Sequence, residues 1–167
     1  MTSLAGNAAA KAAFRAAMSG AQLHHAWLFA GPEGVGKASF ARAAATRMLA
    51  EAAGAEHLPG DFDVPEAHAT RRMIEAGAHP DYRELARLPK DPAKPDENFA
   101  RSITIAQVRG LGPMFATKPS MSSRRVVVID SIDDVERPGA ANALLKNLEE
   151  PPAGTIWRNP SLVMCCT

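Results

Sequence analysis

Residues 31–38 read Gly-Pro-Glu-Gly-Val-Gly-Lys-Ala, and they constrain this chain more than any other segment. They match the phosphate-binding loop G-x-x-x-x-G-K-[ST] at every position except the last. In such a loop the glycines turn backbone N–H groups toward phosphate oxygens, and the lysine reaches the β- and γ-phosphates. The corresponding residues here are Gly31, Gly34, Gly36 and Lys37. The helix that follows would direct the positive end of its dipole at the same anion.

The last position of the loop departs from the pattern. Ala38 stands where a hydroxyl group would bind Mg²⁺, and a methyl group cannot bind a cation. Ser39 comes one position later, but a helix turns it by about 100° from Ala38, so it would face elsewhere. The loop therefore predicts nucleotide-binding ancestry, with ATP and Mg²⁺ bound weakly or not at all.

The surroundings of the loop support the match. Residues 26–30 are a short apolar run, which is typical of a buried parallel strand. After the loop, Phe40, Ala44 and Met48 recur every four residues, as on the buried face of a helix. Strand, glycine-rich loop and helix follow in the order that the motif requires.

A second strand is predicted at residues 126–129, which are three valines and an isoleucine followed by Asp130. Both strands are apolar throughout, so we expect them to be adjacent in a parallel sheet with helices on both faces. Asp130 would then lie near the loop, where a nucleotide-associated Mg²⁺ finds a carboxylate. The next residue is Ser131, where a hydrolase of this type carries a glutamate that polarises water. We therefore predict no catalytic residue.

Composition is that of a single globular domain, with 167 residues of which 46% are hydrophobic. The net charge of +1 favours neither nucleic acid nor a membrane, and no run of 18 apolar residues exists. The two cysteines, at 165 and 166, give neither a disulfide framework nor a metal-binding spacing. We expect a cytoplasmic protein.

Other elements can be assigned along the chain. Residues 51–78 resemble an insertion or a poorly ordered connection, and residues 89–98 a surface loop. The remaining predicted elements are an amphipathic helix within 1–20, a strand that ends at Leu88, a helix weakened by glycine and proline after Ile103, and a helix over 138–150. In the last of these, Ala141, Leu144, Leu145 and Leu148 share one face that would pack on the sheet.

Residues 142–152 read N-A-L-L-K-N-L-E-E-P-P and resemble the signature N-A-L-L-K-x-L-E-E-P-P of bacterial clamp-loader subunits. Residues 24–29, before the phosphate loop, resemble the entry strand of the same proteins. The residues of the signature helix are Asn142, Leu144, Leu145, Lys146, Leu148, Glu149 and Glu150. The resemblance covers residues 4–157 and implies the AAA+ version of the P-loop α/β fold, a parallel sheet flanked by helices.

The resemblance also implies a role. ATP-hydrolysing subunits of this family carry Thr or Ser after the loop lysine and Asp-Glu after the second strand, so Ala38 and Asp130-Ser131 are more like the delta-prime class. Delta-prime is the non-hydrolysing member of the DNA polymerase III clamp loader and helps to place the sliding clamp on primed DNA. The implied partners are the ATPase subunit and delta, and indirectly the clamp and the DNA.

Two departures from the family carry further expectations. Family members often hold a zinc module of four cysteines between the loop and the second strand, but residues 38–129 contain no cysteine, so we predict no zinc. We expect His57, His68 and His79 to be surface histidines.

The second departure follows Trp157, where the family would continue with an apolar strand. Arg158-Asn159-Pro160 suits a central strand poorly, so we expect the following residues not to replace one. We predict an AAA+ domain over 1–157 that is incomplete at its C-terminal end, and an atypical tail at 158–167 that comes from a truncation or a frameshift. Two other functions stay open: a P-loop ATPase or nucleotide kinase with a degenerate loop, and a non-functional remnant.

Overall fold

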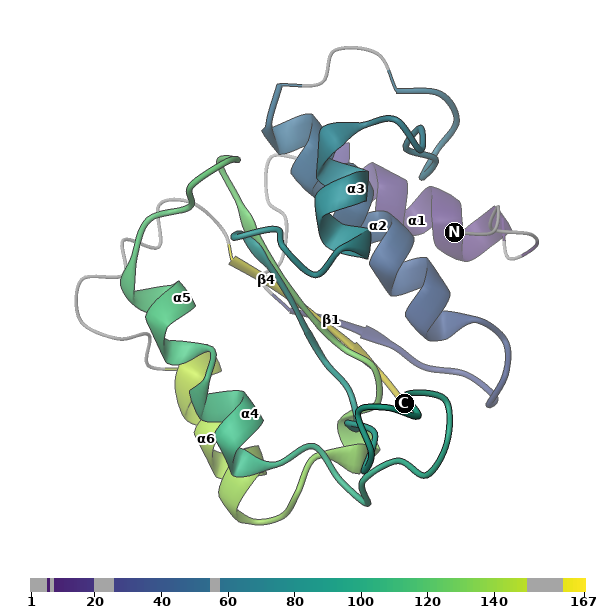
Figure 1. Ribbon diagram of the computed structural model, residues 1–167. Coiled ribbons are helices and arrows are strands. Elements are labelled where there is room, and N and C mark those ends of the chain that lie inside the picture. The colour runs from purple at the N-terminus through teal and green to yellow at the C-terminus, as the bar shows by residue number, and fades with distance from the viewer. Residues whose placement is uncertain (1–5, 7, 20–25, 55–57, 150–160) are drawn as a thin grey trace.

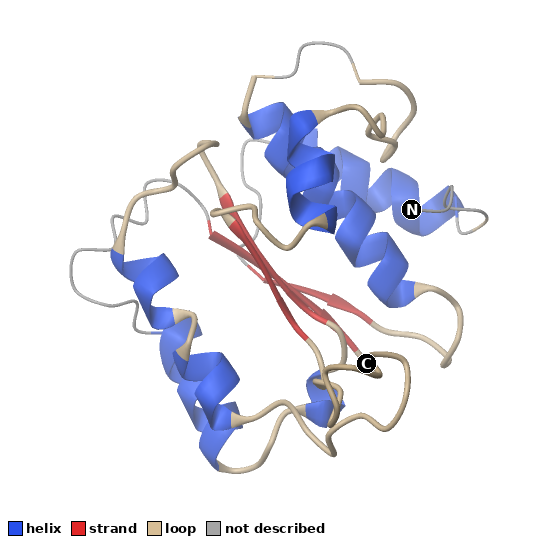
Figure 2. Cartoon of the chain, in the orientation of Figure 1, coloured by secondary structure: helices blue, strands red, loops and turns tan. Residues whose placement is uncertain are grey.

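The computed structural model describes residues 6, 8–19, 26–54, 58–149 and 161–167. A four-stranded parallel sheet separates two layers of helices (Figure 1). The strands are β1 (Ala26–Phe29), β2 (Tyr82–Leu85), β3 (Arg125–Ile129) and β4 (Ser161–Cys166). Figure 2 shows the sheet nearly edge-on, with helices on both faces. The predicted parallel sheet flanked by helices is confirmed.

The strand order is β1-β4-β3-β2, so the predicted contact between β1 and β3 is wrong. β4 lies between them, with Val163 opposite both Ala26 and Val127. The expectation that no strand could follow Trp157 is wrong as well. Proline removes a ladder donor only where it lies inside a strand, and Pro160 precedes the first residue of β4 in the sequence. The apolar run over 162–166 suits a central strand.

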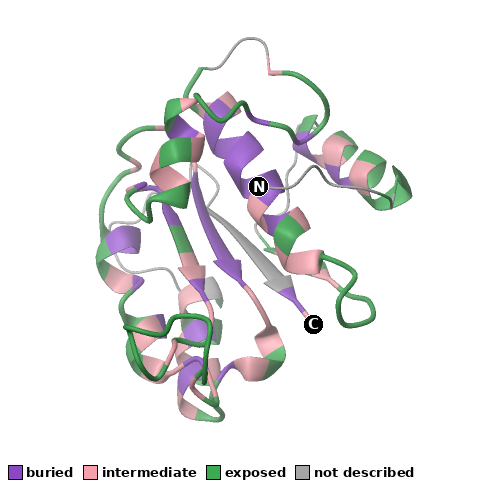
Figure 3. Ribbon diagram, turned by 45° about the vertical axis from the view of Figure 1, so that its right-hand side comes forward, coloured by how far each residue is buried: buried purple, intermediate pink, exposed green. Residues whose placement is uncertain are grey.

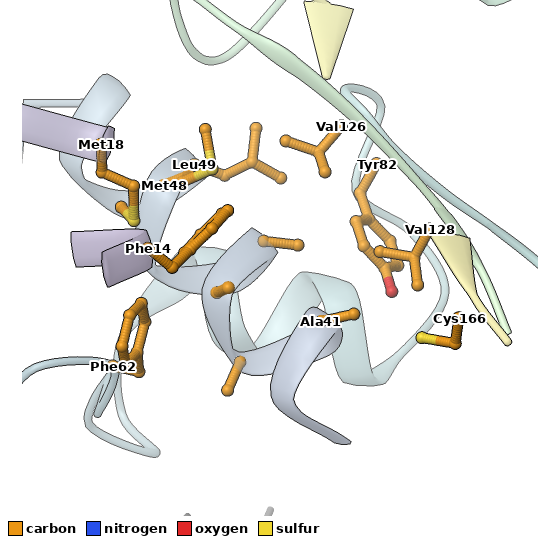
Figure 4. Close-up of a cluster of buried hydrophobic side chains, with 13 residues drawn as sticks. Phe14, Met18, Ala41, Met48, Leu49, Phe62, Tyr82, Val126, Val128 and Cys166 are labelled. Atoms are coloured by element: carbon orange, nitrogen blue, oxygen red, sulfur yellow. The ribbon is translucent and has the colours of Figure 1, made fainter. Parts of the chain in front are cut away.

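One layer consists of α1 (Ala8–Ser19), α2 (Lys37–Ala52) and α3 (Ala69–Glu75). Side chains of α1 and α2 pack against Tyr82, Val126 and Val128 of the sheet (Figure 4). Phe14 of α1 lies at the centre of an aromatic group, with its ring centroid 4.9 Å from that of Trp27. The predicted N-terminal amphipathic helix is therefore present and is held by this cluster.

The opposite layer consists of α4 (Ile105–Arg109), α5 (Gly112–Ala116), the short 3₁₀ helix η1 (Ile132–Asp134) and α6 (Gly139–Glu149). The helix expected after Ile103 is divided in two, and Pro113 lies in the first turn of α5. Thr104 and Gln107 form a capping box at the start of α4.

Helix α6 covers the sheet with part of the predicted face, because Leu144 is buried and Ala141 packs against the same core cluster. Ala140 and Leu144 are buried, four residues apart, whereas Leu145 is 52% exposed. Leu145 is turned by about 100° from Leu144 and lies at the exposed edge of this face. The prediction that Leu145 packs on the sheet is wrong, and the side chain of Leu148 lies outside the described residues.

The segment between α2 and β2 is packed against the domain where it is described. Phe62 and Val64 are buried, and the side chain of Arg47 donates hydrogen bonds to three carbonyl oxygens of the segment. It is thus more than a poorly ordered connection. β2 ends at Leu85 rather than Leu88, and residues 90–99 are exposed, as predicted for a surface loop (Figure 3).

None of the helices that the structure describes is long and apolar enough to cross a lipid bilayer.

Candidate functional site

The glycine-rich loop connects β1 to α2, in the order that the sequence predicted. Gly34 (φ 79°) and Gly36 (φ 86°) adopt left-handed backbone conformations, and Gly36 is the residue just before the first helical residue. A Cβ atom at either position would meet no atom within 4 Å. The backbone conformation, and not lack of space, therefore favours glycine here.

Lys37 is the first residue of α2, and its side chain folds back over the loop. Its Nζ donates hydrogen bonds to the carbonyl oxygens of Gly31 and Pro32, each at 2.7 Å. The loop residues 31–36 are exposed. An exposed loop, a lysine ammonium and the start of a 16-residue helix fit an anionic group such as a phosphate.

Mg²⁺ fits this site less well than a phosphate does, because one of its expected oxygen ligands is missing. Ala38 offers no oxygen and instead packs, half-buried, against the core cluster beneath α2. Ser39 is exposed, so its hydroxyl lies on a different side of the helix from the Ala38 methyl. The P-loop hydroxyl that would bind the cation is absent from this position.

Asp130 follows the last residue of β3 and is bound by a side chain from α2. Arg42 Nη2 lies 3.0 Å from Asp130 Oδ1, and Arg42 Nε donates to Glu84 Oε1 of β2 at 2.7 Å. One guanidinium thus connects the helix that begins in the phosphate loop to the ends of β2 and β3. The structure therefore places Asp130 against α2, the helix that follows the phosphate loop.

Electrostatic coupling ties this group together. The hydrogen bond that Arg42 donates to Glu84 raises the pKa of Arg42, although burial opposes the rise, and Asp130 adds to it. Tyr82 donates its hydroxyl to Glu84 Oε2 at 2.9 Å, and burial raises the pKa of Tyr82 far above its ordinary value. Glu84 therefore accepts hydrogen bonds on both of its carboxylate oxygens.

Cys166, at the end of β4, lies next to the same charges. Burial raises the pKa of its thiol, Asp130 and Glu84 add to this rise, and Lys37 and Arg42 oppose it. The loop follows β1, and the carboxyl ends of parallel strands lie at one edge of the sheet, so the ends of the central strands β4 and β3 are at the edge that carries the loop. Sequence reasoning missed Arg42 and Glu84. β2 reads Tyr-Arg-Glu-Leu, and nothing in this pattern distinguishes Glu84 from its charged neighbour Arg83.

Other residues lie elsewhere. Two further carboxylates follow β3, but Asp134 pairs with Arg87 at 3.0 Å and Asp133 is exposed, so neither replaces the missing glutamate at Ser131. The signature helix lies on the face of the sheet opposite α2, so the structure does not bring it together with the phosphate loop (Figure 1). Its exposed residues are Asn142, Leu145, Lys146 and Glu149, and Leu144 is buried. Glu150 lies outside the described residues.

The histidines are only partly as predicted. His79 is 1% exposed, so its prediction as a surface histidine is wrong. Its Nδ1 accepts the backbone N–H of Asp81 at 3.1 Å, which satisfies the ring inside the domain. His68 caps the start of α3, and His57 lies outside the described residues. Within the described ranges, no three His, Cys, Asp or Glu side chains gather as a metal site.

Known proteins resemble this chain over most of its length. Residues 6–158 match the family model described as "DNA polymerase III, delta subunit". The chain belongs to this family. It is 33% identical over 136 residues to the DNA polymerase III subunit delta' of Pseudomonas aeruginosa, covering 81% of this chain and 37% of that protein. It is 32% identical over 133 residues to subunit tau of Bacillus subtilis, covering 80% of this chain and 20% of that protein.

A solved structure agrees on the fold. The crystal structure of a gamma subunit-related protein of DNA polymerase III from Thermotoga maritima has a TM-score of 0.53, at 18% sequence identity. The match covers 94% of this chain and 38% of that one. The predicted P-loop fold of the clamp-loader subunits, with a parallel sheet between helices, is confirmed, as is the delta-prime-like character of the sequence. The chain spans between a fifth and two fifths of the length of these relatives.

Proposed function

We propose that this chain acts as a non-hydrolysing, delta-prime-like subunit of a bacterial clamp loader. Its task would be to bind other subunits, without nucleotide turnover of its own. The observation that carries the proposal is the altered cation position: Ala38 supplies no ligand, and the Asp130 carboxylate is bound by Arg42. Hydrolysis by P-loop proteins depends on a cation held by both positions.

The name of the relatives alone does not decide between subunits, since delta', tau and gamma proteins all match. Hydrolysing subunits need a ligand hydroxyl after the loop lysine and a water-orienting residue after the strand. This chain has Ala38 and Ser131 at these two positions. The two residues together favour delta-prime over tau and gamma.

The proposed partners are the ATPase subunit and the delta subunit, and through them the sliding clamp and primed DNA. We propose that no cofactor is required and that no zinc is bound. The exposed side chains of the signature helix, Asn142 and Lys146 among them, are available to a neighbouring subunit. A nucleotide would bind at the loop weakly or not at all.

Co-purification tests the proposal. The chain, tagged, is co-expressed with the ATPase subunit and delta of a bacterial clamp loader, and the complex is analysed by size-exclusion chromatography. We expect a stable complex, and we expect Lys37→Ala to assemble equally well because the role does not depend on nucleotide. A chain that elutes alone, while a known delta-prime assembles under the same conditions, would contradict the proposal and favour a non-functional remnant.

A further inference from the structure

Residues 117–123, in the connection between α5 and β3, are held in place without a buried side chain (Figure 1). All of their side chains are exposed or half-buried, and Met121 is 47% exposed. Burial of apolar side chains therefore contributes little to the position of this segment. Its position depends instead on the hydrogen bonds of its backbone.

One buried carboxylate accepts three of these hydrogen bonds. Asp81 is 1% exposed, and its Oδ1 accepts the N–H of Ser120 at 2.7 Å. Its Oδ2 accepts the N–H groups of Met121 at 2.7 Å and of Ser122 at 3.0 Å. Three consecutive N–H groups thus surround one carboxylate, as they surround anions in other backbone nests. Asp81 is itself anchored to the sheet, because its backbone carbonyl accepts the N–H of Val126 at 2.9 Å.

The same contacts leave a buried donor without a partner. The side chain of Arg125 is 4% exposed, and its Nη2 donates to Thr117 Oγ1 at 3.1 Å. Its Nε lies 4.0 Å from Asp81 Oδ1, too far for a hydrogen bond, and has no other partner among the described residues. A buried donor without a partner costs free energy, and water would satisfy it once the segment moved away. The closed position therefore carries a cost that opening removes.

We infer that residues 117–123 form a strap, which the Asp81 carboxylate closes and which opens as one unit while the sheet stays folded. Opening gives up hydrogen bonds but little apolar burial, and the last of these bonds runs from the N–H of Ser123 to the Ala52 carbonyl at 3.3 Å. Ala52 ends α2, so the closed strap joins this helix to the start of β2. The inference does not rest on the proposed function, and either can fail alone.

Amide hydrogen exchange of the whole chain, followed by NMR, tests the inference first in the parent protein. We expect the amides of residues 120–123 to share one protection factor and to exchange at least about tenfold faster than the amides of β3, because local opening costs less than global unfolding. Protection factors that differ by more than about tenfold among these four amides, or that equal those of β3, would overturn the inference.

Asp81→Asn then tests the role of the carboxylate. Asparagine keeps the shape of the side chain but offers one acceptor oxygen in place of two. Exchange at residues 120–122 should become at least about tenfold faster, while exchange in β3 stays within about threefold of the parent. Asp91→Asn is the matched control, because it removes the same charge and also an acceptor for a loop N–H, that of Ala93 at 2.9 Å, but in an exposed loop. It should leave residues 120–122 at the parent rate.

Arg125→Met separates the hydrogen bonds of Asp81 from its ion pair. The carboxylate keeps its three donors in this variant, so exchange at residues 120–122 should be at most about threefold faster than in the parent. Circular dichroism first checks that each variant is folded. If Asp81→Asn is not, the double variant Asp81→Asn/Arg125→Met, which leaves no unpaired buried charge, is compared with Arg125→Met instead. A folded Asp81 variant without faster exchange would contradict the inference, as would an equal rise in Arg125→Met or in Asp91→Asn.

Discussion

Replacing Arg47 with methionine should destabilise the domain more than any substitution of an exposed arginine. The Arg47 side chain is 6% exposed, and it makes four hydrogen bonds from α2. Its Nε donates to Glu51 Oε1 at 2.7 Å, and its two Nη atoms donate to three backbone carbonyls of the segment before α3. Methionine retains the apolar stem but none of these donors.

The expected loss in the free energy of unfolding follows from the partners that Arg47→Met leaves without a donor. Breaking a buried ion pair by removing one partner costs about 3–5 kcal/mol. Glu51 keeps its second partner, Arg15 at 2.7 Å, and is partly exposed, so we expect the lower end, about 3 kcal/mol. In a domain of this size each kcal/mol lowers the melting temperature by about 2–4 °C, so the midpoint should fall by about 6–12 °C.

Thermal unfolding followed by circular dichroism measures this change, and limited proteolysis between α2 and α3 reports where it acts. Arg87→Met is the control, because its pair with Asp134 is more exposed and should contribute at most about 1 kcal/mol. Arg47→Lys should recover little of the loss, since one ammonium cannot reproduce the planar set of donors. Equal midpoints for Arg47→Met and Arg87→Met would refute the reasoning.

Three further results are expected. Burial lowers the pKa of His79, Arg83 lowers it further and Asp81 opposes the shift, so the unfolded chain takes up the proton at a higher pH than the folded domain does. The free energy of unfolding should therefore fall as the pH drops below about 6.5. His79→Asn keeps an acceptor but does not titrate, so its free energy of unfolding, measured with urea, should depend less on pH across that range. Steady-state ATPase activity should be undetectable, and a rate that disappears in Lys37→Ala would contradict this and favour the ATPase or kinase alternative. Leu145→Lys should leave the free energy of unfolding within about 0.5 kcal/mol of the parent value, as for other exposed positions, whereas Leu144→Ala should lower it by about 2–5 kcal/mol, both measured by chemical denaturation.

The parts of the fold that the sequence predicted are those encoded over a few neighbouring residues. An apolar run, three glycines and a periodic helix were sufficient for β1, the phosphate loop and α2, and four β-branched residues were sufficient for most of β3. These signals depend on local backbone preference and on burial of consecutive side chains. They therefore do not depend on knowing which elements meet in space.

The errors arose where distant residues decide the outcome. Residues 158–160 disfavour a strand, but the apolar run that follows them pairs with β1 at a separation of 137 residues and with β3 at a separation of 36 residues. His79 is an exception, because its ring nitrogen accepts the backbone N–H of Asp81, two residues away, and no periodic pattern encodes that short-range contact. Arg42 and Glu84 are ordinary charges in the sequence and become a pair only when α2 lies against β2.

The side chain at position 38 takes no part in the contacts that hold the phosphate loop in its shape. The loop is held by the chain's own groups: left-handed glycines at 34 and 36, the Lys37 ammonium on two loop carbonyls, and Arg42 between the ends of two strands. A ligand hydroxyl at position 38 contributes to none of these contacts, so its replacement by a methyl group removes a cation ligand without removing a support of the loop. A domain built in this way can keep the fold of a P-loop protein after the residue that would bind the cation has changed.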